Sequence, residues 1–130
     1  MSANIAIPSI LQIGAGALGE IAPTLARLGC ANPLIVSDAV LARIGLVGQL
    51  TALLDAAGIA HALFDGTEPE PSDACVMAGV HALLAGSPRG PFDAVIALGG
   101  GSVIDTAKVM AVLAASGKTI RAIAVPAVVA

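Results

Sequence analysis

The chain has 130 residues, of which 57% are hydrophobic and 12% charged, and its formal net charge is −3. This length suits one compact domain, and a mean hydropathy of +0.94 excludes a disordered chain and favours a sheet that is buried on both faces. Six scattered basic residues, the absence of Trp and Tyr, and only two Phe exclude the charged and aromatic surfaces that nucleic-acid binding requires.

Membrane and secretion signals are also missing from the sequence. No segment approaches the roughly 18 uninterrupted apolar residues of a membrane helix, because the best candidate, residues 103–115, contains Asp105. The N-terminal residues MSANIAIPS lack the basic region of a secretory signal. We therefore predict a cytoplasmic protein that contacts no membrane. Cys30 and Cys75 are isolated in apolar surroundings, which predicts buried free thiols.

Short apolar runs alternate with helical patterns along the whole chain. The predicted elements are, in chain order, a strand at 10–13, a helix at 17–28, a strand at 34–37, a broken helix at 40–57, a strand at 59–64, a helix at 74–85, a strand at 94–98, a helix at 103–115 and a strand at 121–125. Gly29 and Gly58 are expected to end helices, and the proline-rich residues 65–73 form a loop. This alternation predicts an α/β fold, an open parallel sheet with helices on both faces, as one Rossmann-like nucleotide-binding domain over residues 1–130.

The most informative motif is DAVIALGGGSVIDTAK at residues 93–108. Here a strand meets Gly99, Gly100 and Gly101, then Ser102 and a helix. A loop without side chains at a helix N-terminus offers backbone N–H groups and a positive dipole to a phosphate. The alternative is a tight turn without a ligand, although three successive glycines exceed what a turn requires.

The residues after this glycine triplet have two interpretations. Ser102 and Asp105 fit a capping box, S-x-x-D, in which Asp105 stabilises the helix start. Asp105 could equally make a polar contact with a bound cofactor. Lys108 is expected to form a surface ion pair with Asp105, three residues before it.

A second glycine motif, G-x-G-x-x-G, covers residues 14–19, and Asp38 follows Gly19 by 19 residues at the end of the next strand. This combination matches the dinucleotide fingerprint with its ribose-binding acid. The alternatives are a simple turn with a chance match at Gly19, and a helix N-cap role for Asp38. A carboxylate at position 38 accepts from an adenosine 2′-hydroxyl and repels a 2′-phosphate, so NAD is preferred over NADP. His61 lies in a predicted strand and His81 in a predicted helix, 20 residues apart, and both are assigned structural roles.

Together these residues resemble the N-terminal domain of the iron-containing alcohol dehydrogenases, which have the dehydroquinate-synthase-like fold. The resemblance covers nearly the whole chain and is carried by GAGAL at 14–18, LIVSD at 34–38, FDGTEPEPS at 64–72, the block at 93–108 and IAVP at 123–126. It implies that Gly99, Gly100, Gly101 and Ser102 bind the cofactor pyrophosphate. It further implies that Asp38 faces the adenosine ribose and that Asp105 lies near the nicotinamide side.

The sequence departs from this family at three places, one of which is the connection at residues 116–119, shorter than in most alcohol-dehydrogenase members. The family continues after the last strand with P-T-T-A-G-T-G-S-E, whereas this chain reads PAVVA at 126–130, and the N-P-T of the family is replaced by EPS at 70–72. Members hold Fe2+ through one Asp and three His of a C-terminal helical domain, and those ligands are absent from this sequence.

The full-length function implied by the resemblance is NAD(P)-dependent alcohol oxidation or carbonyl reduction. For this chain we expect a truncated or fragmentary form limited to nucleotide binding and inactive alone, without catalytic or metal-ligating residues. Its expected partners are the nucleotide cofactor and either further copies of itself in a homo-oligomer or a missing C-terminal domain. Two alternatives stay open: a lyase or glycerol-phosphate dehydrogenase relative on the same fold, and a non-enzymatic nucleotide-binding or interaction module.

Overall fold

A parallel β-sheet organises the fold. The computed structural model describes residues 10–12, 18–67, 72–114 and 120–126. Within these ranges five strands pair in parallel in the order β1-β5-β4-β2-β3. The strands are β1 (Ile10–Gln12), β2 (Pro33–Val36), β3 (Ala62–Phe64), β4 (Ala94–Gly99) and β5 (Arg121–Pro126). The predicted α/β class with an open parallel sheet is confirmed.

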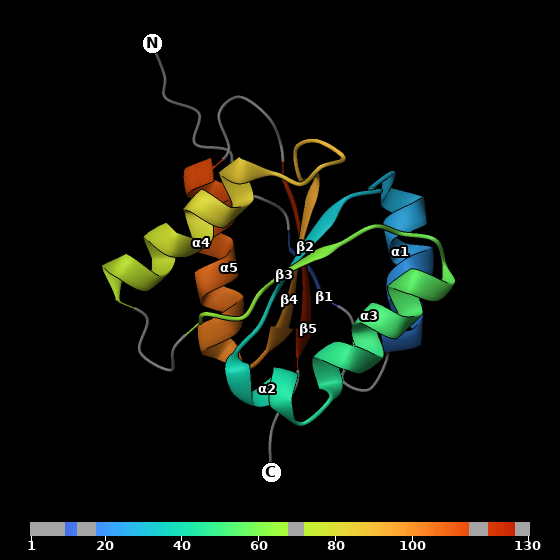
Figure 1. Ribbon diagram of the computed structural model, residues 1–130, viewed down its shortest axis with the longest axis horizontal. Coiled ribbons are helices and arrows are strands. Elements are labelled where there is room, and N and C mark those ends of the chain that lie inside the picture. Colours follow the sequence, from blue (N-terminus) through green and yellow to red (C-terminus); the bar gives the residue numbers. More distant parts are fainter. Residues whose placement is uncertain (1–9, 13–17, 68–71, 115–119, 127–130) are drawn as a thin grey trace.

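Helices cover both faces of this sheet. The helical elements are η1 (Leu18–Glu20), α1 (Ile21–Leu28), α2 (Ala39–Arg43), α3 (Leu46–Ala56), α4 (Asp73–Ala85) and α5 (Gly101–Ala114). Figure 1 shows the sheet nearly edge-on, with α4 and α5 on one side and α1 and α3 on the other. None of the described helices has both the length and the apolar character needed to cross a membrane.

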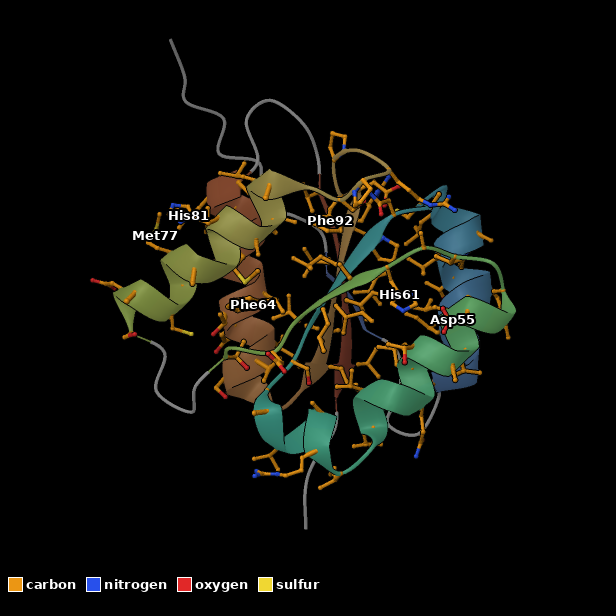
Figure 2. The ribbon with its side chains drawn as sticks, viewed as in Figure 1. Asp55, His61, Phe64, Met77, His81 and Phe92 are labelled. Carbon is orange, nitrogen blue, oxygen red and sulfur yellow. The ribbon has the colours of Figure 1, made fainter. Side chains whose placement is uncertain are left out.

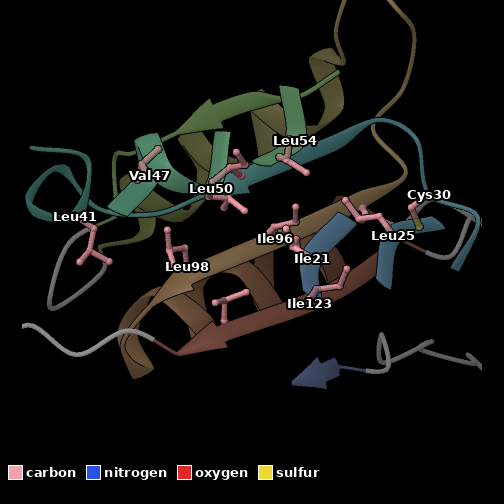
Figure 3. Packing of buried hydrophobic residues seen from close by; sticks show 13 residues of the cluster. Ile21, Leu25, Cys30, Leu41, Val47, Leu50, Leu54, Ile96, Leu98 and Ile123 are labelled. Carbon is pink, nitrogen blue, oxygen red and sulfur yellow. The ribbon is translucent and has the colours of Figure 1, made fainter. Parts of the chain in front are cut away.

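The central strand β4 joins the two halves of the hydrophobic core. All of its residues are buried, and successive side chains point to opposite faces. Ile96 and Leu98 pack with buried residues of α1 and α3, such as Leu25 and Leu50 (Figure 3). Val95 packs with residues of α4 and α5 on the other face. Each fully buried Leu or Ile contributes about 1.5–3 kcal/mol, so β4 is held firmly on both sides.

Glycines define the ends of the helices on the α1 and α3 side. Gly29 has a φ of 72° and its N–H donates to carbonyls in the last turn of α1, which confirms the predicted stop. The helical region predicted at 40–57 is broken at Gly45, whose φ is 95°.

The third strand is shorter than predicted. Its ladder with β2 begins at Ala62, one position after the level of Pro33, which has no N–H to donate.

The amino edge of the sheet is closed by polar side chains. The Asp93 carboxylate accepts from the backbone N–H groups of Ala31 at 2.7 Å and Asn32 at 3.0 Å. The Asn32 side-chain amide donates to three acceptors, namely Ser87 Oγ, Gly90 O and Pro91 O.

Both cysteines are free and buried, as predicted. Burial raises the pKa of the Cys30 thiol, the charge of Asp93 raises it further, and Arg121 opposes them.

Candidate functional site

The carboxyl ends of β2, β3 and β4 lie at one edge of the sheet and form the candidate site. Val36 pairs with Ala97 on one side and with Phe64 on the other, so the residues that follow these strands come together. β2 leads through α2 and α3 to β3, whereas β4 leads through α5 to β5 on the opposite side. The boundary between β2 and β4 is therefore where the strand order reverses, and open α/β sheets bind ligands at such points.

The three glycines after β4 differ in what the fold requires of them. Gly99 has a φ of 155°, and a Cβ there would lie 2.7 Å from Cγ2 of Val103. The close approach of β4 and α5 thus excludes a side chain at this position. Gly100 and Gly101 are exposed, and a Cβ on either would have no atom within 4 Å. Packing therefore does not account for the missing side chains at these two positions.

Helix α5 begins at the end of this loop and packs against β4 and β5. The N–H of Ile104 donates to the carbonyl of Gly100 at 3.0 Å, so the N–H groups of the first turn have no intrahelical acceptor. Helices α2 and α4 are capped by the side chains of Asp38 and Ser72, but a glycine has no side chain to cap α5. The first turn of α5 also contains no acidic residue. These N–H groups and the positive helix end can accept an anion.

The predicted capping box at Ser102 and Asp105 is wrong. α5 starts at Gly101, two residues earlier than predicted, because Gly99 alone makes the turn and Ser102 already lies in the first helical turn. Ser102 is half-buried, and its carbonyl accepts from Thr106 Oγ1 at 2.7 Å. Asp105 is exposed one turn into α5. The ion pair predicted between Asp105 and Lys108, both of which the structure describes, does not occur. Among the described residues, the salt bridge that is present joins His61 and Asp55.

Asp38 follows β2, and the glycine loop follows the neighbouring strand β4. Its Oδ1 accepts from the N–H of Leu41 at 2.8 Å, which confirms the helix N-cap alternative. Its backbone forms an isolated antiparallel bridge with Gly66 after β3. The carboxylate is half-buried and has lone pairs left beyond the one used for the cap. The cap therefore holds Asp38 in place at the edge and leaves it able to accept from a ligand hydroxyl.

The strand order contradicts the predicted pairing of the first glycine motif with Asp38. A dinucleotide fingerprint needs the glycine loop and the acid on neighbouring strands. β1 pairs with β5, and β5 and β4 separate β1 from β2. Residues 13–17, which include Gly14 and Gly16, lie outside the described residues, and Gly19 is exposed in η1 with open space around its Cβ position. The loop beside Asp38 is the one at residues 99–101.

Two buried hydroxyl groups at this edge were not singled out from the sequence. Ser37 Oγ donates to the carbonyl of Leu98 at 2.8 Å, and Thr67 Oγ1 donates to the carbonyl of Ser37 at 2.8 Å. Both residues are buried. One sequence pattern could have identified them. Each is a small hydroxylated residue within three positions of the end of an apolar strand, at the edge of the sheet where the glycine loop also lies.

The histidines lie apart from the candidate site. His61 Nε2 is 3.8 Å from Asp55 Oδ1, and Figure 2 shows His81 on the outer side of α4 near Met77. Among the residues that the structure describes, no three His, Cys, Asp or Glu side chains come close enough together to hold a metal ion. The described residues therefore do not fit an iron ion.

Two known dehydrogenases are similar in sequence to this chain. The long-chain-alcohol dehydrogenase 1 of Geobacillus thermodenitrificans is 39% identical over 112 residues, which are 86% of this chain and 27% of that protein. The NAD-dependent methanol dehydrogenase of Bacillus methanolicus is 36% identical over 118 residues, which are 91% of this chain and 30% of that protein. The chain thus spans less than a third of the length of these relatives.

Solved structures share the fold. A 1,3-propanediol oxidoreductase matches 97% of this chain and 36% of its own with a TM-score of 0.76 at 25% identity. An alcohol dehydrogenase from Oenococcus oeni matches 96% of this chain and 36% of its own with a TM-score of 0.75, also at 25% identity. The sequence model of the iron-containing alcohol dehydrogenases matches residues 8–130. The chain therefore belongs to the iron-containing alcohol dehydrogenase family.

Proposed function

We propose that this chain binds NAD at the boundary between β2 and β4, as the cofactor-binding part of an alcohol or carbonyl oxidoreductase. Gly99, Gly100, Gly101 and Ser102 hold the pyrophosphate, and Asp38 accepts from the adenosine ribose. The observation that carries the proposal is the open space at Gly100 and Gly101. Two successive exposed glycines without a packing role fit a backbone that a ligand must approach closely.

The electrostatics of the glycine loop support a bound diphosphate. The first turn of α5 offers N–H groups without intrahelical acceptors, and no carboxylate lies in that turn to compete with an anion. Asp105 is exposed one turn further along the helix, which supports a polar contact with the cofactor rather than a role in the helix cap. When bound, NAD would supply the nicotinamide that accepts a hydride from an alcohol.

The preference for NAD over NADP rests on Asp38. Its carboxylate would repel a phosphate on the 2′-oxygen of the ribose and accept a hydrogen bond from a free 2′-hydroxyl. The relative from Bacillus methanolicus is named as NAD-dependent, which supports the same preference. The substrate class follows from the names of the relatives, which include alcohol, methanol and lactaldehyde enzymes. We assign no step to iron, because the described residues do not fit it.

Titration calorimetry with NAD+ and NADP+ tests this proposal on wild type, Gly100→Val and Gly19→Val. Both glycines are exposed, and a Cβ on either has open space, so the two variants are matched in kind. We expect Gly100→Val to abolish NAD+ binding and Gly19→Val to retain it, with NADP+ binding more weakly than NAD+. Circular dichroism confirms that both variants are folded. The reverse pattern would assign the pyrophosphate to the first glycine motif, and no binding to wild type would refute the proposal.

A further inference from the structure

Two buried hydroxyl groups tie together the ends of the three strands that form the candidate site. Ser37 is fully buried, and its Oγ donates to the carbonyl of Leu98 at 2.8 Å. The N–H of Ser37 donates to the carbonyl of Phe64 at 2.9 Å, and its own carbonyl accepts from Thr67 Oγ1 at 2.8 Å. Ser37 thereby connects the end of β2 to the end of β4 on one side and to the segment after β3 on the other.

The residues joined by this hydrogen bond directly precede the two parts of the proposed NAD site, Asp38 and the glycine loop. Ser37 directly precedes Asp38, and Leu98 directly precedes Gly99. The pairing of Val36 with Ala97 places Ser37 beside Leu98, just beyond the point where β2 leaves the sheet. A single side-chain hydrogen bond therefore joins the residue before the ribose acid to the residue before the pyrophosphate loop.

A serine without solvent exposure is unusual unless its hydroxyl is hydrogen-bonded. Apolar alanine or valine at position 37 would continue the buried pattern of β2, in which every residue is buried. The hydroxyl at this position instead holds two loops that leave the sheet in different directions, through α2 and through α5. Its net contribution to folding is small, so the precise spacing of the loops is the property that it controls most directly.

We propose that Ser37 and Thr67 are positioning residues that set the distance between the ribose-binding carboxylate of Asp38 and the glycine loop. This inference rests on the proposed function, since it concerns the same nucleotide site. A ligand that contacts both loops, such as NAD+, is sensitive to their spacing. Loss of either hydroxyl should weaken NAD+ binding even though neither side chain contacts the cofactor.

The test is calorimetric titration of the full 130-residue chain with NAD+. We expect Ser37→Ala and Thr67→Val to raise the Kd for NAD+ by about fivefold each, because part of the binding free energy, about that of one hydrogen bond, must then restore the spacing of the loops. Thr67→Ser keeps the hydroxyl and should bind as wild type does. The matched control is Ser87→Ala, which removes a hydrogen bond from Asn32 Nδ2 at the opposite edge of the sheet and should leave the Kd unchanged.

A double-mutant cycle separates positioning from a general loss of structure. Asp38→Ser keeps an N-cap for α2 but shortens the side chain, so it removes the reach to the ribose. Adding Ser37→Ala to Asp38→Ser should then change the Kd for NAD+ by less than twofold, because the spacing no longer matters. Equal losses in the two backgrounds would overturn the proposal.

The remaining outcomes also separate the two proposals. If wild type binds NAD+ and both Ser37→Ala and Thr67→Val bind it with the wild-type Kd, the positioning role is refuted and the proposed function stands. If wild type does not bind NAD+, the proposed function itself fails. Should Ser37→Ala not fold, the comparison of Thr67→Val with Thr67→Ser decides the question alone.

Discussion

Substitution by alanine should destabilise the fold at Gly99 and leave it almost unchanged at the adjacent Gly100. In Gly99→Ala the new methyl group would lie 2.7 Å from Cγ2 and 2.9 Å from Cβ of Val103, whereas carbon atoms in contact are about 3.5–4.0 Å apart. Rotation of Val103 does not relieve the overlap, because Cβ stays in place when χ1 turns and valine strongly prefers one χ1 rotamer in a helix. The loop or α5 must therefore shift.

The magnitude follows from two contributions. Overpacking a well-packed region costs about 1–3 kcal/mol, and Val103 is 2% exposed, so it has little room to yield. A φ of 155° at a residue other than glycine adds backbone strain of about 1 kcal/mol or more. We expect Gly99→Ala to lower the free energy of unfolding by about 3 kcal/mol.

Urea denaturation followed by far-ultraviolet circular dichroism measures this effect. Gly100→Ala is the matched control, because its Cβ would have no atom within 4 Å, and its unfolding free energy should stay within about 0.5 kcal/mol of wild type. Equal midpoints for Gly99→Ala and wild type would show that the contact between β4 and α5 is looser than described. The assignment of different roles to the two glycines would then be refuted.

Three further predictions concern stability away from the glycine loop. Asn32→Ala removes a buried amide that donates to three acceptors and should cost about 2–3 kcal/mol in urea unfolding; a loss below 1 kcal/mol would argue against that network. Ser72→Ala removes the N-cap of α4 and should lower the unfolding free energy by about 1 kcal/mol, whereas Ser72→Gly should lower it by only a few tenths. The raised pKa of Cys30 means that the folded chain holds this proton more tightly than the unfolded chain, so its contribution to stability is present below the ordinary thiol pKa of 9.0 and is lost as the pH rises through the folded-state value. Cys30→Ala should therefore lose less stability than wild type between neutral and alkaline pH, and an identical pH dependence of unfolding would contradict the assignment.

Local features of the site were predictable because they depend on neighbours in the chain. An apolar run followed by glycines predicts a strand, a turn and a helix start wherever it occurs, and β4 and α5 follow this pattern. The N-cap role of Asp38 depends on a residue three positions later, Leu41. The sequence pattern predicts a start of α5 that is two residues too late, because Gly100 and Gly101 resemble a continuing loop, whereas the structure needs only Gly99 for the turn.

The arrangement of the strands was not predictable from such patterns. Both glycine motifs follow a strand and precede a helix, and the spacing predicts that Asp38 acts together with the first of them. The pairing of β2 with β4 rather than with β1 brings Asp38 beside the loop at residues 99–101 instead. The pairing of β2 with β4 depends on contacts between residues 61 positions apart, such as Pro33 and Ala94, for which no local spacing is diagnostic.

The amino-acid sequence alone is enough to identify the alternation of elements, the parallel α/β class, the buried thiols and the glycine-rich helix start, because hydrophobic period and turn residues act over a few positions. Tertiary structure alone reveals which loop meets Asp38, which glycine the packing requires, and that Ser37 joins β2 to β4 through the carbonyl of Leu98. These features arise when distant segments pair and exclude water from one another, so the hydrogen bonds and close approaches that define the site exist only in the folded chain.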